Sequence, residues 1–119
     1  MSKNKGFSIT SADRYSLALY ELASDGNVLE SIESQSFSIL NLISSSKDFS
    51  NLIKDPTNNQ EDLLKVINNI SENNKFETLL KNFLSFLVIK KRLFYLEQIL
   101  KSFIETCSKK RGELKAELK

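Results

Sequence analysis

The stretch FETLLKNFLSFLVIKKRL, from Phe76 to Leu93, decides how the rest of the chain is arranged. Placed on a helix at about 100° per residue, it carries apolar side chains well beyond one face. Its broad apolar stripe is formed by Leu79, Leu80, Phe83, Leu84, Phe86 and Leu87, with Val88 and Ile89 at the edges. A helix with so much apolar surface lies either at the centre of a bundle or between a bundle and a partner.

Length and composition indicate one folded domain without a membrane span. The 119 residues are 40% hydrophobic and 27% charged, which is ordinary for a globular protein. No apolar run is long enough to cross a bilayer, and the opening MSKNKGFSIT lacks the apolar core of a secretory signal. Cys107 is the single cysteine, so an internal disulfide is impossible and a reducing compartment is expected.

Charge is distributed unevenly along the chain. Residues 1–89 carry 8 basic and 11 acidic side chains, whereas residues 90–119 carry 9 and 4. One interpretation is a nucleic-acid-binding or regulatory helical domain that uses Lys90, Lys91, Arg92, Lys109, Lys110 and Arg111. We favour solvated helix ends instead, because no aromatic platform or nucleic-acid motif accompanies the charge.

Four helices are expected before the Phe76–Leu93 stretch. The first begins after Thr10 or Ser11, and its inner face comprises Ala12, Tyr15, Leu19, Leu22 and Ala23. A second helix spans about 28–43, a third follows a Ser46 cap and stops before Pro56, and a fourth begins near residue 60. Two capping signals are predicted, Thr57 to Gln60 for the fourth helix and Asn74 with Glu77 for the fifth.

A sixth helix and a change of period follow the stretch. No glycine or proline separates it from LFYLEQILKSFIETC, so we place a break near Lys90–Arg92 to avoid one very long helix. The sixth helix has a stripe of Leu93, Leu96, Leu100, Phe103 and Cys107. After Gly112, ELKAEL alternates polar and apolar residues, which predicts a strand-like tail. The prediction is an all-α six-helix bundle over 1–110, with 111–119 as a linker and the truncated start of a second domain.

The residues of catalytic and metal sites are missing from the sequence. There is no histidine, and one cysteine cannot assemble a Cys/His metal site or a Cys–His nucleophile. Three scattered glycines form no phosphate-binding loop, and the adjacent Glu61 and Asp62 suit a helix N-terminus better than acid–base chemistry. We therefore predict an interaction module without a cofactor, not an enzyme.

Three segments in order carry a family resemblance. RYSLALYELA (14–23), DFSNLIKDPT (48–57) and NFLSFLVIKKRLFYLEQILKSF (82–103) resemble the delta subunit of ATP synthase, the family of the oligomycin-sensitivity-conferring protein. Arg111-Gly112-Glu113 is similar to the Arg-Gly that introduces the family's second domain. Ser16 and Leu17 depart from the small or polar residues usual in the opening motif.

The resemblance implies a non-catalytic stator subunit on the cytoplasmic face of a bacterial inner membrane. Its six-helix bundle would lie on top of the catalytic head and bind the N-terminal helix of an alpha subunit between its first and fifth helices. The peripheral-stalk b subunit would bind through the missing C-terminal region. Residues expected to contact the alpha-subunit helix are Tyr15, Ala18, Leu19, Leu22, Leu79, Phe83, Phe86 and Lys90, with core packing as the alternative for the apolar ones.

Overall fold

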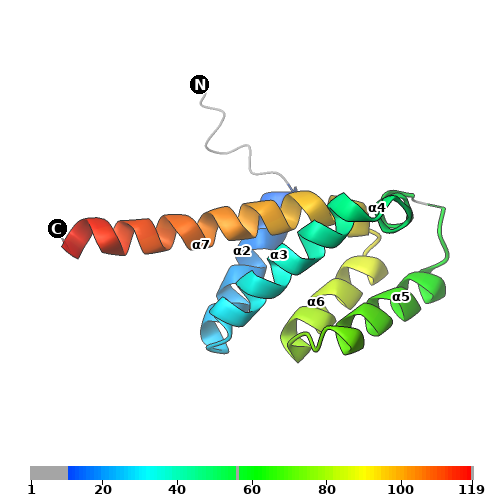
Figure 1. Ribbon diagram of the computed structural model, residues 1–119, viewed down its shortest axis with the longest axis horizontal. Helices are drawn as coiled ribbons and strands as arrows, with labels where there is room; N and C mark the ends of the chain where they lie inside the picture. Colours follow the sequence, from blue (N-terminus) through cyan, green and yellow to red (C-terminus); the bar gives the residue numbers. More distant parts are fainter. Residues whose placement is uncertain (1–10, 56, 119) are drawn as a thin grey trace, which may run out of the picture.

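Six α-helices and one 3-10 turn form the part of the chain that the computed structural model describes, residues 11–55 and 57–118, with 112–118 as backbone alone. They are α2 (Ser11–Asp25), α3 (Leu29–Ser45), α4 (Lys47–Lys54), α5 (Gln60–Asn73), α6 (Thr78–Ile89), η1 (Leu93–Tyr95) and α7 (Leu96–Leu118). In Figure 1, α7 runs along the molecule, α2 and α3 lie against it, and α5 and α6 form a hairpin. The expected six-helix, all-α bundle is confirmed.

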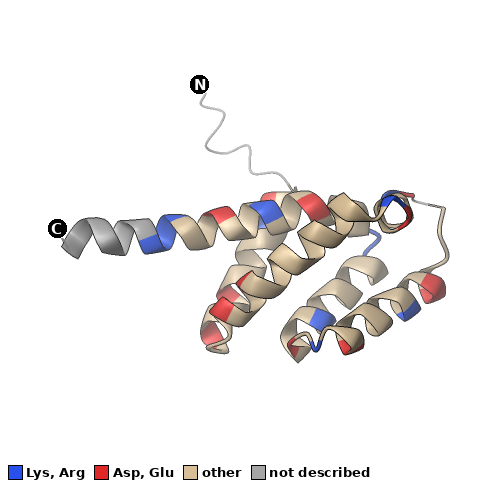
Figure 2. Ribbon diagram, viewed as in Figure 1, with Lys and Arg blue, Asp and Glu red and all other residues tan. Residues whose placement is uncertain are grey.

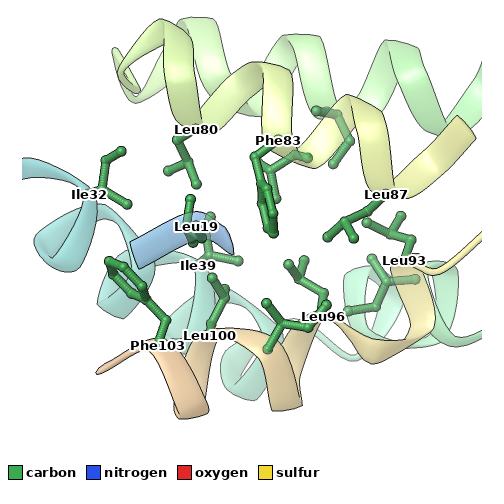
Figure 3. Packing of buried hydrophobic residues seen from close by; sticks show 14 of the residues in the cluster. Leu19, Ile32, Ile39, Leu80, Phe83, Leu87, Leu93, Leu96, Leu100 and Phe103 are labelled. Atoms are coloured by element: carbon green, nitrogen blue, oxygen red, sulfur yellow. The ribbon is translucent and has the colours of Figure 1, made fainter. Parts of the chain in front are cut away.

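The core is centred on α7. Leu96, Leu100, Phe103 and Cys107 are at most 1% exposed, and Leu93 in η1 is 3% exposed, so the predicted stripe is confirmed. Figure 3 shows Leu93, Leu96, Leu100 and Phe103 converging with α2, α3 and α6 residues such as Leu19, Ile39 and Leu80. The α7 helix is therefore the common surface on which earlier helices are assembled.

The seam between α2 and α7 contains buried polar groups. Ser16, 1% exposed, donates from Oγ to the Asp13 carbonyl at 2.9 Å and lies 2.9 Å from Ser102 Oγ. Ser102 Oγ donates in turn to Asp13 Oδ1 at 3.1 Å. Ser16 was not among the residues expected on the inner face of this helix. It can lie in the core because its hydroxyl has hydrogen-bond partners there.

The Phe76–Leu93 stretch is divided between the core and the surface. Leu80, Leu84 and Leu87 are 0%, 1% and 0% exposed, which places one face of α6 in the core. On other faces Phe86 is 43% exposed and Ile89 is 55% exposed. The α6 helix thus packs on the bundle with one flank and leaves apolar surface on the other.

The break expected near Lys90–Arg92 is confirmed. The α6 helix ends at Ile89, and Lys91 adopts a left-handed φ of 60°. The Arg92 N–H donates to the Leu87 carbonyl at 2.8 Å, and the Lys91 N–H donates to the Val88 carbonyl at 3.0 Å. This pair of bonds is a Schellman motif, which closes the helix and turns the chain toward η1.

Both predicted capping boxes are wrong, although Ser46 caps α4 as expected, accepting from the Phe49 N–H at 3.2 Å. The cap of α5 is Asn59, whose Oδ1 accepts from the Glu61 N–H at 2.7 Å. Thr57 instead donates its hydroxyl and its N–H to Asp55 Oδ1, at 2.7 and 2.9 Å, and these bonds lower the pKa of Asp55. Pro56, expected to stop the preceding helix, lies outside the described residues.

The start of α6 also differs from the prediction. Asn74 donates from Nδ2 to the Ile70 carbonyl at 2.9 Å, so its side chain caps the end of α5. Glu77 precedes α6 without a side-chain cap bond, and its N–H donates to Gln35 Oε1 at 2.9 Å. The partner of the Glu77 N–H is therefore a side chain of α3, 42 residues away in sequence, and a local sequence signal cannot reveal such a partner.

The strand-like tail is wrong, because residues 113–118 continue α7 as a helix. The alternation of polar and apolar residues in ELKAEL does not produce a strand, because Glu, Leu, Lys and Ala are all strong helix formers. The interior glycine costs only about 1 kcal/mol. Before Gly112, Arg111 binds Glu33 of α3 through two bonds of 2.7 and 2.9 Å. The predicted burial of the tail side chains lies outside the described residues.

Candidate partner-binding groove

The α2 and α6 helices run antiparallel and form the two walls of a groove. At one end Tyr15 meets Phe86 edge-to-face, with ring centroids 6.1 Å apart. At the other end Gly26 lies beside Leu79, since a Cβ placed on Gly26 would be 3.6 Å from Leu79 Cδ1. Two helices that are in contact at both ends leave a trough between them where the intervening side chains are small.

The groove has a volume of about 410 Å³. Its lining residues are Tyr15, Ala18 and Leu22 from α2, with Leu79, Asn82, Phe83 and Phe86 from α6. These α2 residues have i, i+3, i+7 spacing and those of α6 recur every three or four positions, so each set occupies one helical face. Ala18 contributes only a methyl group between the larger side chains, which leaves the space open.

Six of the eight residues that we expected at the alpha-subunit site lie together in this groove. Leu19 does not, because it is 0% exposed and points into the core. Lys90 lies just beyond the lining, with Nζ 5.8 Å from the Phe86 ring centroid. Asn82 was not among the expected site residues, although it is i+3 from Leu79 and i−4 from Phe86 and so shares their helical face.

The lining of the groove suits apolar recognition. None of its lining residues carries a formal charge at neutral pH, and the polar groups among them belong to Tyr15 and Asn82. Leu22 is 49% exposed and Phe86 is 43% exposed, so two large apolar side chains face solvent on opposite walls. Covering such side chains is favourable at roughly 25 cal/mol per Å² of apolar surface buried.

A second hollow of about 450 Å³ lies elsewhere, where the loop before α5 meets the loop after α6. Its apolar floor includes Ile53 and Val88, but its rim is polar, with Asp55, Asn58 and Lys91. The Asp55 carboxylate already accepts two hydrogen bonds from Thr57. Phe94, which is 44% exposed, also lines this hollow, but no exposed aliphatic side chain accompanies it as Leu22 accompanies Phe86 in the α2–α6 groove.

The basic residues considered for nucleic-acid binding form two separate groups. Lys90, Lys91 and Arg92 follow α6, whereas residues 109–111 lie more than three turns along α7 from its start. Arg111 is paired with Glu33, and this carboxylate raises the pKa of the guanidinium further. The described residues therefore present no single basic stripe for a phosphate backbone to follow.

The described residues contain no group of three or more His, Cys, Asp or Glu side chains that could hold a metal ion. None of their helices combines the length and hydropathy that a membrane crossing requires.

Comparison with known proteins adds evidence from outside the chain. The family model described as ATP synthase delta (OSCP) subunit matches residues 12–119. The chain belongs to that family. The resemblance carried by the three sequence segments is thereby confirmed.

Relatives and a solved structure agree with this assignment. The chain is 67% identical over 118 residues to the ATP synthase subunit delta of Pelagibacter ubique, covering 99% of this chain and 64% of the relative. It is 30% identical over 118 residues to the Rhodospirillum rubrum subunit, covering 99% and 63%. A chain in the cryo-EM structure of the Toxoplasma gondii mitochondrial ATP synthase hexamer matches with a TM-score of 0.75 and 30% identity, over 79% of this chain and 52% of that one. This chain thus spans less than two thirds of the length of these relatives.

Proposed function

We propose that this chain is the helical bundle of a non-catalytic stator subunit of ATP synthase. Its α2–α6 groove binds the amphipathic N-terminal helix of an alpha subunit at the top of the catalytic head. Residues 111–119 lead toward a second domain, through which the peripheral-stalk b subunit is bound. The complex lies at the cytoplasmic face of a bacterial inner membrane, and the subunit helps to hold the head still during proton-coupled ATP synthesis.

The observation that carries this proposal is the groove itself. Apolar side chains from two antiparallel helices line one face each, and Leu22 and Phe86 remain half-exposed on opposite walls. An amphipathic helix with apolar residues at i, i+3 and i+4 spacing covers such a trough along its length. Family membership supports the identity of the partner, and the predominantly apolar lining, which carries no formal charge at neutral pH, supports a role in binding.

The first prediction tests occupancy of the groove. Ala18→Asp places a carboxylate among apolar side chains, so a peptide of the alpha-subunit N-terminus should bind at least about tenfold more weakly. Calorimetric titration measures the affinity, and circular dichroism checks that the bundle remains folded, since Ala18 is exposed in the free chain.

Leu17→Asp is the matched control. Leu17 adjoins Ala18 on α2 and is 45% exposed, but it does not line the groove. Its replacement should leave peptide affinity within about twofold while imposing the same change of charge on the same helix. Equal losses in both variants, or no binding by the folded parent chain, would show that the groove is not the site.

A further inference from the structure

The groove ends in opposite charges, one on each wall. On α2 the lining positions Tyr15, Ala18 and Leu22 are continued at the next helical step by Asp25. On α6 the lining positions are continued by Lys90, four residues after Phe86. Because the helices are antiparallel, Lys90 lies at the Tyr15 end and Asp25 at the Leu79 end.

The neighbouring charges reinforce this difference. Lys90 is followed in sequence by Lys91 and Arg92. On α2, Tyr15 is preceded by Arg14 and by Asp13, which is hydrogen-bonded to Ser102. Around Asp25 the α2 helix adds Glu21, and at the start of α6 Glu77 stands against Lys75 and Lys81, so three acidic residues face two basic ones. Figure 2 shows the acidic positions gathered at the α2–α3 turn and the basic loop that follows α6. The two ends of the groove therefore carry net charge of opposite sign.

On the basis of the proposed function, we infer that the bound helix carries complementary charges at a fixed separation. An acidic side chain faces Lys90, and a basic side chain faces Asp25. Eleven residues separate Leu79 from Lys90, which is about 16 Å along a helix. The two charges of the partner are therefore about 11 residues apart, three turns along the same face as its apolar anchors.

Side-chain charge decides this arrangement, not the dipole of the partner helix. The apolar lining extends over only eight residues of α2, from Tyr15 to Leu22, which are about 10 Å apart along the helix. A partner helix of five or more turns, about 27 Å or longer, extends past the roughly 16 Å between the two charged ends, so its own termini do not lie at Lys90 and Asp25. Full unit charges on side chains then outweigh the half charges of distant helix ends.

Charge reversal at each end tests the inference with the alpha-subunit N-terminal peptide as probe. Lys90→Glu and Asp25→Lys should each weaken binding roughly threefold or more at low salt, and the effect should shrink at high salt. The matched controls are Lys65→Glu and Glu72→Lys, exposed positions on α5 that do not line the groove. Both controls should bind like the parent chain.

A charge swap identifies the facing residue. One acidic residue of the peptide, replaced by lysine, should restore affinity for Lys90→Glu but not for Asp25→Lys. If the parent chain binds the peptide and Ala18→Asp abolishes binding, but either reversal leaves affinity unchanged, the charge arrangement is overturned and the groove stands. If the folded parent chain fails to bind the peptide, the proposed function fails, and this inference fails with it.

Discussion

Cys107 combines an apolar position with a charged neighbourhood at the end of the core. The side chain is 1% exposed, and its burial raises the pKa of the thiol from an ordinary 9.0 to about 11. The Glu33 carboxylate acts in the same direction, whereas the Arg111 guanidinium opposes it. A buried thiol with a raised pKa has little thiolate at neutral pH and is a poor nucleophile.

This environment predicts a loss of stability at alkaline pH. Because the folded chain holds the thiol proton more tightly than the unfolded chain, this contribution to stability is complete below about pH 9. It is lost as pH rises from 9 to about 11. Urea unfolding of the parent chain and of Cys107→Ala across that range should give a steeper decline for the parent. Parallel declines would contradict the buried, protonated thiol.

Some residues could be predicted from the sequence alone and others could not. The stripe from Leu93 to Cys107 is correct throughout, because large apolar side chains at helical spacing have only the core to occupy. Ser16 was missed because its suitability for the core depends on Ser102, which is 86 residues away in sequence. Asn82 was missed because its polar side chain gave no sign that it lies beside the apolar lining, whereas Lys90, which was expected at the site, lies just beyond that lining.

At the scale of the elements, three helices end with the same device. Asn27, Lys75 and Lys91 have φ of 58°, 53° and 60°, and each follows the end of a helix. In each case the next N–H donates five residues back: Val28 to Ala23, Phe76 to Ser71 and Arg92 to Leu87. These are Schellman motifs in which a residue with a side chain occupies the position that glycine prefers.

Glycine at Lys91 should therefore stabilise the bundle. Relief of the left-handed strain is worth about 1 kcal/mol, which exceeds what the unfolded chain gains in freedom. Lys90→Gly is the control, because Lys90 has a φ of −81° in the right-handed region and gains nothing from glycine. Thermal unfolding should show a higher midpoint for Lys91→Gly and a lower one for Lys90→Gly. A lower midpoint for both would contradict this account of the turn.

The elements differ in how far the sequence could define them. Helices with strong periodicity were placed within about two residues, since their ends coincide with breaks in the apolar pattern. Caps were less predictable, because Asn59, Asn74 and Thr57 compete for similar backbone partners and sequence does not rank them. The tail after Gly112 was predicted as a strand from alternation alone, which is a weak signal over six residues.

At the scale of the whole molecule, stability and recognition depend on different faces of the same helix. Leu19 and Leu22 lie three residues apart on α2, yet Leu19 is 0% exposed and Leu22 is 49% exposed. Leu19 packs in the core, whereas Leu22 lines the groove. This separation allows the bundle to keep an apolar binding surface without weakening its own interior.

A pair of truncations should separate the two roles. Leu19→Ala should lower the free energy of unfolding by about 2–5 kcal/mol, because it leaves a cavity in the core. Leu22→Ala should change unfolding by less than about 1 kcal/mol but weaken binding of the alpha-subunit peptide several-fold. Urea denaturation and calorimetry measure the two quantities. A large loss of stability in Leu22→Ala would place that side chain in the core instead.

The seam between α2 and α7 also has a consequence for biosynthesis. Ser16 and Ser102, which meet in that seam, are 86 residues apart, so a ribosome makes nearly everything between them before α2 finds its main neighbour. Until α7 is made, Leu19 and the rest of that face can pack only against α3 and α6, so the core around α2 stays incomplete. Translation speed through the α7 codons, and any chaperone that shields α2 meanwhile, then governs how much of the newly made chain escapes aggregation.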